Sequence, residues 1–449
     1  MKLSFREKAA YGLGAVGKDW VYGIVSGFLL IYFNAVLGIS GTFTGILFMC
    51  ARVFDALNDP IMGVIVEKTN TKMGKFRPWL LIGTIANAIV LVAMFSVPDN
   101  LTSLQLHVYI SVAYILWGMT YTIMDIPYWS MIPAITESGK DRENISVIAR
   151  SCAGVGAALA AALTTVIVSA MGGSNEKLGY QRYLIMVSIF FVVAIVITVL
   201  NVKERTRTVQ KSASVKEMLG SLISNDQAMV VVTGIIIFNA SLYLTQNLAT
   251  FFFRYEVGNK DLYGIFATVG GGAQILSMMT LPFFRQKYSC KQILKGAIST
   301  TIFGYVCLFL LSTFRCYNLI LLCLAAVIVF VGFGLATVLT TIFLADTVDY
   351  GEWKNHQRNE SVVFSLQTFV VKLASAVSGL IAGIGIDLIR LDTNAKVQTD
   401  GTIFGLHFLM TIIPLCGLVI SIIFFMKKYK LDEEFLAKIK SEISSVKEN

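Results

Sequence analysis

The sequence has few charged residues for its length, and this shortage excludes most classes of protein. Only 14% of its 449 residues are Asp, Glu, Lys or Arg, whereas 55% are hydrophobic and the mean hydropathy is +0.70. A soluble domain usually carries about 25% charged residues, because these cover its water-facing surface. The composition therefore excludes a soluble enzyme of this size and predicts a polytopic membrane protein.

Two further shortages exclude a disordered chain and a β-barrel. Proline occurs 7 times against 30 phenylalanines, which argues against disordered or low-complexity segments. The alternating ten-residue segments of a transmembrane β-barrel are also missing, since runs such as Tyr183–Leu200 and Leu319–Val331 are almost continuously apolar. A helix of about 20 apolar residues crosses a bilayer with its backbone polar groups satisfied. The predicted fold class is therefore an all-α polytopic membrane protein.

Motifs of enzymes and metal centres are absent from the sequence. The seven cysteines show no CxxC or Cys/His spacing, and the three histidines lie far apart (His107, His356 and His407). No GxSxG, HExxH or P-loop motif occurs, and the GxGxxG match at Gly12–Gly17 opens an apolar stretch with no strand before it. We interpret those glycines, with Gly154 and Gly156, as close helix-packing positions. We therefore expect neither an enzyme nor a bound cofactor.

The apolar stretches predict twelve transmembrane helices, separated near the midpoint by one long polar segment. The predicted spans are 11–35, 40–66, 79–98, 105–133, 145–172, 181–200, 228–253, 262–284, 293–313, 317–345, 361–388 and 403–426. This pattern predicts a six-helix bundle over 1–200, a central linker over 201–227, a second six-helix bundle over 228–426 and a tail over 427–449.

The distribution of Lys and Arg predicts the orientation. With the N-terminus inside, 26 of the 37 Lys and Arg residues fall in inner segments, 7 in outer loops and 4 within spans. Cytoplasmic loops carry such an excess of positive charge, so both termini, the linker and the tail are predicted to be cytoplasmic. This bias accounts for the net charge of +9 without a nucleic-acid partner and allows attraction to anionic membrane lipid. The first helix is predicted to be an uncleaved span.

Ionisable residues inside the predicted spans are the first candidates for function, because charge at membrane depth is costly. They are Lys18, Asp19, Arg52, Asp55, Asp59, Asp125, Arg150 and Lys372. Seven of these eight lie in the N-terminal half. The sequence therefore predicts the main site there, with Lys372 reaching it from the other half.

The second predicted helix contains a pair of aspartates, Asp55 and Asp59, four residues apart and hence on one helix face. Two carboxylates this close in a low dielectric repel each other, so one becomes protonated or a cation binds between them. Carboxylate oxygens suit a hard cation such as Na⁺. Arg52 partly balances the charge, and the alternative is that Arg52 pairs with Asp55 to hold helices together.

The fourth predicted helix combines one carboxylate with aromatic side chains. Asp125 has Tyr121 four residues before it and Trp129 four residues after it, all on one face. A carboxylate that accepts hydroxyl protons beside an aromatic ring suits a sugar. Lys18-Asp19 and Arg150 would complete a polar pocket.

These segments resemble the glycoside–pentoside–hexuronide:cation symporters of the major facilitator superfamily, and most closely their melibiose-transporting members. The similarity runs over nearly the whole chain and is strongest in Tyr11–Asp19, Ala51–Gly63, Gly74–Gly83, Tyr114–Pro133, Ala345–Lys354 and Ser365–Lys372. The resemblance implies two six-helix bundles, a bacterial inner-membrane location and function as a monomer. It also implies symport of a glycoside, such as the α-galactoside melibiose, with Na⁺, Li⁺ or H⁺.

The resemblance also assigns roles to individual residues. The implied cation-site residues are Asp55, Asn58, Asp59 and Thr122. The implied sugar-site residues are Lys18, Asp19, Tyr121, Asp125, Trp129, Arg150 and Thr368. Arg52 and Lys372 would balance charge and support coupling. One position departs from the pattern, since Thr337 stands where melibiose-transporting members have tryptophan, and this puts the identity of the sugar in question.

Other functions fit the same sequence less closely. A proton-coupled carrier of another glycoside, a glucuronide or a pentoside is the main alternative. A Na⁺-coupled lipid carrier would need an apolar pocket, against which the charges at Lys18, Asp19, Asp125 and Arg150 argue. A sugar sensor would bind sugar without uptake. We expect transport by alternating access, with the cation and the sugar stabilising each other's binding.

Overall fold

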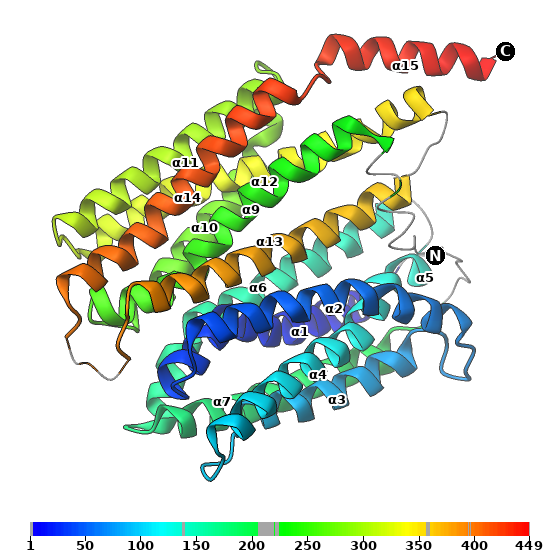
Figure 1. Cartoon of the computed structure of the whole chain (residues 1–449). Helices are drawn as coiled ribbons and strands as arrows, with labels where there is room; N and C mark the ends of the chain where they lie inside the picture. The colour runs from blue at the N-terminus through cyan, green and yellow to red at the C-terminus, as the bar shows by residue number, and fades with distance from the viewer. Residues whose placement is uncertain are drawn as a thin grey trace. The chain divides into compact units, whose positions relative to one another are not determined.

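The computed structural model describes residues 3–136, 140–204, 220, 224–355, 360–393, 395 and 397–448. Within these ranges, side chains are described except at 56, 57, 60, 64, 67, 133, 140–143, 345, 348, 355, 360–368, 440 and 443–448. The regular elements of the described residues are helices (Figure 1), which confirms the predicted fold class. Eleven of them are long and apolar enough to cross a membrane. The one predicted span that is not among these eleven is 40–66, which corresponds to α2 and contains Arg52, Asp55 and Asp59.

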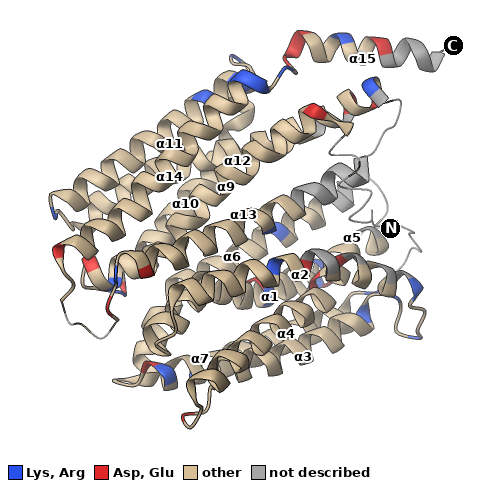
Figure 2. Cartoon of the chain, viewed as in Figure 1, with Lys and Arg blue, Asp and Glu red and all other residues tan. Residues whose placement is uncertain are grey.

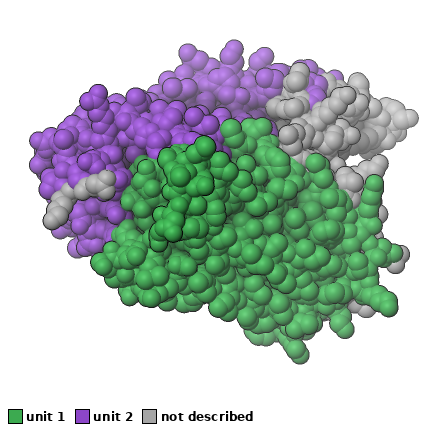
Figure 3. Space-filling model, turned by 60° about the horizontal axis from the view of Figure 1, so that its bottom comes forward, with its two compact units in different colours: residues 1–39, 50–211 green, residues 40–49, 212–449 purple. Residues whose placement is uncertain are grey.

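The chain forms two compact units, residues 1–39 with 50–211, and residues 40–49 with 212–449 (Figure 3). The start of α2 thus belongs to the second unit and the rest of that helix to the first, a division that the hydropathy pattern does not predict. The helices of unit 1 are α1 (Phe5–Ile31), a π-helical turn (Tyr32–Val36), α2 (Gly41–Lys68), α3 (Arg77–Phe95), α4 (Ser103–Ser130), α5 (Ile132–Ile135), α6 (Lys140–Gly172) and α7 (Glu176–Asn201).

The regular elements described in unit 2 are also helices. Its helices are α9 (Asp226–Phe251), a π-helical turn (Phe252–Glu256), α10 (Leu262–Phe284), α11 (Cys290–Thr313), α12 (Leu319–Asn355), α13 (Glu360–Leu388), α14 (Asp400–Lys428) and α15 (Glu433–Glu448). The last helix lies in the predicted tail. It packs on the end of α12, where the indole of Trp353 lies against Phe435 and donates to Glu442 at 2.6 Å.

Several helices begin where a short polar side chain caps the free backbone N–H groups. Ser4, Thr102 and Ser289 each form a capping box with the third residue of the helix that follows, at the starts of α1, α4 and α11. Asn225 caps α9 in a simpler way. These caps fix the ends of the apolar helices, because an unpaired N–H group would be costly near a membrane.

Small residues allow the helices of unit 1 to approach closely, as the glycine pattern of α1 predicts. A methyl group added at Gly17 would lie 3.1 Å from the Cβ of Ala194 on α7. One added at Gly156 on α6 would collide with the backbone of α1 at Val16 and Trp20. The GxGxxG match is therefore a packing surface. This packing fixes the register of α1, which carries Lys18.

Candidate functional site

Lys18 is the centre of a charged group in the interior of unit 1. Its ammonium nitrogen lies 2.8 Å from Oδ2 of Asp19 and 2.8 Å from Oδ1 of Asp125 on α4. The Lys18 side chain is 2% exposed, whereas those of Asp19 and Asp125 are 20% and 29% exposed. One buried cation thus holds two partly accessible carboxylates, which retain oxygen atoms that can accept hydrogen bonds from a ligand.

Trp129 lies beside this charged group. The Lys18 ammonium is 4.8 Å from the centre of its ring, and the Arg150 guanidinium carbon on α6 is 5.4 Å from it. Both distances fall within the range of cation–π attraction. The indole is therefore held in place by two cations from different helices.

Aromatic contacts bring α1 and α4 together around Lys18. The rings of Tyr11 and Tyr128 stack at 4.5 Å, and the hydroxyl of each donates to the backbone carbonyl of the other. Tyr128 also lies 5.3 Å from the Lys18 ammonium, and Tyr121 lies 6.0 Å from it. The ring of Tyr22 on α1 contacts Tyr121 at 5.4 Å. These contacts hold Lys18 against the face of α4 that bears Asp125.

The carboxylates of α2 face α4 in a matching register. A methyl group added at Gly118 would lie 2.9 Å from Oδ1 of Asp55. One helical turn later, the Thr122 hydroxyl donates to Oδ1 of Asp59 at 3.2 Å. Residues four apart on α2 therefore meet residues four apart on α4. Gly118 leaves the space that the Asp55 carboxylate occupies.

Arg52 belongs to a second charged group, which it forms with Asp55 and Asp59 of α2 and Thr122 of α4. Its guanidinium lies 3.1 Å from Oδ2 of Asp55, and the two side chains are 10% and 7% exposed. The pair predicted as the alternative is thus present within α2. The buried amide nitrogen of Asn58 has no hydrogen-bond partner among the described residues.

The oxygen atoms near α4 fit a small hard cation as cargo. The carboxylates of Asp55 and Asp59 and the Thr122 hydroxyl supply the oxygen ligands that the structure places here. Among the described residues, no group of three or more His, Cys, Asp or Glu side chains could hold a metal ion. A cation here would therefore depend on the Thr122 hydroxyl oxygen as well as on the two carboxylates.

Figure 2 shows that charged residues occur within α1 and α2 as well as at the ends of helices. The structure brings together Lys18, Asp19, Tyr121, Asp125, Trp129 and Arg150 in one group, and Arg52, Asp55, Asp59 and Thr122 in the other. Lys372 lies half-buried on α13 of unit 2, so its reach to the first unit stays a prediction. The side chain of Thr368 lies outside the described residues.

Sequence reasoning missed several residues at these groups. Tyr128 and Tyr22 look like ordinary core aromatics in the sequence, and Gly118 looks like an ordinary packing glycine. A signal for Gly118 was available, since it lies four residues before Thr122 on the same face. Thr337 donates to the carbonyl oxygen of Phe333 at 2.7 Å, so its hydroxyl is bonded to its own helix.

The fold resembles that of solved membrane transporters. A bacterial homologue of the human lysosomal transporter Spinster, in an inward-facing and unoccupied conformation, aligns with a TM-score of 0.74 over 96% of this chain and 98% of that one. The two sequences are 13% identical, so this likeness shows the fold alone. Together with the eleven candidate spans, it defines the chain as a multi-pass protein with the fold of a membrane transporter.

Relatives at the sequence level are also transporters. An uncharacterized symporter, YjmB of Bacillus subtilis (strain 168), is 29% identical over 98% of this chain and 96% of its own length. The inner membrane symporter YicJ of Escherichia coli (strain K12) is 28% identical over 99% and 96%. The isoprimeverose transporter of Lactiplantibacillus pentosus is 25% identical over 97% and 91%.

Residues 10–433 match the family described as MFS/sugar transport protein, and the chain belongs to that family. This confirms the resemblance to the glycoside–pentoside–hexuronide:cation symporters. The chain is a transporter and not an enzyme.

Proposed function

We propose that this chain is a Na⁺-coupled glycoside symporter that carries an α-galactoside such as melibiose across a bacterial inner membrane by alternating access. Asp55, Asn58, Asp59 and Thr122 bind the cation in this proposal. The sugar binds at the group around Lys18, with both chain termini in the cytoplasm. All the described residues of both groups lie in unit 1 of one chain, which supports function as a monomer.

The observation that carries the proposal is the position of both groups on α4. Gly118 and Thr122 face the carboxylates of α2, while Asp125 and Trp129 belong to the group around Lys18. A cation that draws Asp59 toward Thr122 therefore also orders the helix that presents Asp125. Each ligand would increase the affinity for the other by the same factor, and the coupling free energy is typically about 1–3 kcal/mol.

The charges at the proposed sugar site favour a neutral glycoside. Lys18 and Arg150 balance the carboxylates of Asp19 and Asp125, so the group has no formal net charge. A glucuronide would bring an additional buried negative charge, which is costly without a partner. The similarity to the isoprimeverose transporter also supports a glycoside substrate.

The test is uptake of radiolabelled melibiose into inside-out and right-side-out membrane vesicles that contain the chain. Three gradients are compared, namely Na⁺, Li⁺, and H⁺ without either metal ion. Stimulation by Na⁺ supports the full proposal. Uptake driven by protons alone keeps the sugar and makes Asp55 and Asp59 proton carriers. Absence of melibiose uptake under every gradient overturns the α-galactoside assignment, and a panel of other glycosides, pentosides and glucuronides then tests the wider class.

Two carboxylate variants separate the proposed sites. Asp59→Asn is expected to retain sugar binding but lose its stimulation by Na⁺, whereas Asp125→Asn is expected to lose sugar binding itself. Asp99→Asn is the control, since Asp99 is 88% exposed and pairs with Lys177 at the surface of unit 1. Sugar binding to purified protein is measured by calorimetry with and without Na⁺. Unchanged stimulation in Asp59→Asn would place the cation elsewhere.

A further inference from the structure

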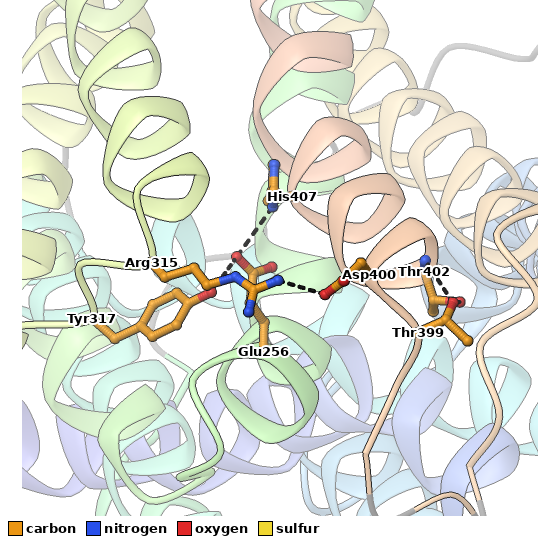
Figure 4. Close-up of polar contacts among 7 residues, drawn as sticks. All are labelled: Glu256, Arg315, Tyr317, Thr399, Asp400, Thr402 and His407. Atoms are coloured by element: carbon orange, nitrogen blue, oxygen red, sulfur yellow. Dashed lines mark hydrogen bonds and ion pairs between the residues drawn. The ribbon is translucent and has the colours of Figure 1, made fainter.

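Unit 2 contains a buried acid–base pair that the proposed transport cycle does not use. Glu256 ends the π-helical turn after α9, and His407 lies on α14. Nδ1 of His407 is 3.1 Å from Oε1 of Glu256 (Figure 4), and the two side chains are 5% and 0% exposed. Sequence analysis did not place Glu256 among the membrane charges, because the predicted span ended at residue 253.

The third member of this cluster is Tyr317, from the turn between α11 and α12. Its hydroxyl donates to the same Oε1 atom at 3.3 Å. Burial, followed by the neighbouring Glu256 carboxylate, raises the pKa of Tyr317 to about 12. Tyr317 therefore keeps its proton at physiological pH and acts as a fixed donor. The Glu256 carboxylate joins three segments that are distant in sequence.

The surroundings of the pair are apolar. The rings of Phe309 and Phe404 lie 5.5 and 5.1 Å from the His407 ring, both edge-on. Oε2 of Glu256 and Nε2 of His407 are buried and have no hydrogen-bond partner among the described residues. Unmet polar atoms in such surroundings are costly, and a charge that no neighbour balances costs more.

Charged groups on the neighbouring elements are engaged elsewhere or lie at the surface. Arg315 and Asp400, from the α11–α12 turn and from α14, form an ion pair whose side chains are 65% and 86% exposed. The Asp387 carboxylate on α13 accepts hydrogen bonds from the N–H groups of Gly41 and Thr42. Arg254 on the π-helical turn lies 5.5 Å from the ring of its neighbour Tyr255.

The Glu256–His407 pair can hold no, one or two protons, and its net charge differs among these three states. With one proton between them, Glu256 and His407 are neutral overall, either as an ion pair or as two neutral groups. Without a proton the pair carries one negative charge, and with two protons it carries one positive charge. Both of these states leave a net charge buried among aromatic rings, so the one-proton state is favoured.

We propose that Glu256 and His407 form a proton-binding site in unit 2, separate from the cation-binding carboxylates of unit 1, and that its occupancy controls the rate of transport. Loss of the shared proton leaves a net negative charge buried between the end of α9 and α14. The part of this proposal that concerns transport rests on the proposed function, whereas the part that concerns proton binding does not.

Proton binding is tested by titration of His407 in purified full-length protein. The chain has three histidines, so the double variant His107→Gln/His356→Gln leaves His407 as the only one. With ¹⁵N-histidine, NMR spectra are recorded from pH 5 to pH 9, with and without Glu256→Gln. We expect the midpoint to move by about one pH unit or more, or to leave the window. An ordinary imidazole midpoint that is unchanged by Glu256→Gln overturns the proposal.

Stability as a function of pH provides a second readout, which does not depend on transport. The folded pair keeps its one proton, whereas the imidazole of an unfolded chain loses its proton above its ordinary pKa of about 6.5. Near pH 7 the unfolded chain thus binds fewer protons than the folded pair, so the pair makes the protein more stable as the pH falls from 7 toward 5.5. His407→Gln should weaken this pH dependence by about 2 °C or more in the unfolding temperature. His107→Gln is the control and should leave this pH dependence unchanged. Equal slopes in the two variants contradict the proposal.

The control of transport is tested by sugar uptake at pH 6.5 and pH 9 under a constant Na⁺ gradient. The parent protein is expected to lose about threefold or more of its rate at pH 9, where the pair gives up its proton, corresponding to ~0.7 kcal/mol, and His407→Gln to lose much less. Tyr317→Phe keeps both titratable groups and should retain the pH dependence. A parent protein without any uptake would overturn the proposed function while leaving the titration result interpretable. An identical pH profile in His407→Gln would overturn the control of transport.

Discussion

The two units differ in where they bury charge. Unit 1 holds Lys18, Asp19 and Asp55 along the middle of α1 and α2, and Asp125 in the last two turns of α4, in two groups that meet on α4. In the described part of unit 2, Glu256 at the end of the π-helical turn after α9 and His407 in the first turns of α14 form a buried acid–base contact. This difference agrees with the proposal that the sugar and the cation bind in unit 1.

The comparison also shows how each unit balances its charges. In unit 1, one lysine serves two carboxylates, so oxygen atoms are left for a ligand. In unit 2, Glu256 contacts the His407 ring and accepts a hydrogen bond from the phenol of Tyr317, which is the geometry on which the proposed proton-binding site rests.

The largest effect is expected from Lys18→Met. It leaves the carboxylates of Asp19 and Asp125 without their shared cation, and breaking a buried charge pair costs about 3–5 kcal/mol. We expect loss of uptake and a large drop in unfolding temperature, measured in purified protein. Adding Asp125→Asn to Lys18→Met should recover part of the stability but not the uptake. No recovery in the double variant would contradict the shared-charge interpretation.

A smaller effect is expected from Trp129→Ala. The indole supplies the aromatic face of the proposed sugar site and lies beside the cations of Lys18 and Arg150. Sugar affinity should fall by about tenfold or more, equivalent to ~1.4 kcal/mol, when measured by calorimetry. Trp353→Ala in unit 2 is the matched control, since that indole packs on α15. Equal losses in both variants would show that the effect is one of general stability.

Gly118→Ala tests the cation group alone. The added methyl group would lie 2.9 Å from Oδ1 of Asp55, so the carboxylate would have to move. We expect the Na⁺ concentration for half-maximal stimulation to rise by about fivefold to tenfold, with little change in sugar affinity without Na⁺. Gly271→Ala on α10, where an added methyl group meets nothing within 4 Å, is the control. An unchanged Na⁺ response in Gly118→Ala would remove Asp55 from the cation site.

The smallest effect is expected from Arg315→Gln. Its ion pair with Asp400 is mostly exposed, and such pairs contribute about 0–1 kcal/mol. The unfolding temperature should hardly change, and the pH dependence assigned to Glu256 and His407 should persist. Loss of that pH dependence in Arg315→Gln would mean that the surface pair, and not the buried pair, is responsible.

Much of the fold follows from the sequence, because an apolar run in a bilayer must satisfy its backbone by forming a helix. Each predicted span corresponds to an observed helix. The ends were less predictable. The π-helical turn at Phe252–Glu256 continues α9 beyond the predicted end at residue 253, and α15 lies in a segment too polar to be predicted as a span.

The candidate site was predictable in part for a similar reason. A spacing of four residues places Asp55 with Asp59, and Asp125 with Trp129, whatever the rest of the fold does. No spacing within one helix shows which residues of another helix lie opposite. The contacts of Thr122 with Asp59 and of Lys18 with Asp125 join residues that are 63 and 107 positions apart.

The membrane class, the helical spans and the charged faces follow from local hydropathy and helical periodicity, so the amino-acid sequence was enough to predict them. Three contacts became visible only once the helices were packed: one lysine serves two carboxylates, Gly118 leaves space for Asp55, and Glu256 meets His407. Such contacts depend on the rotation and register of packed helices. Many side chains set these together, and no single segment encodes them.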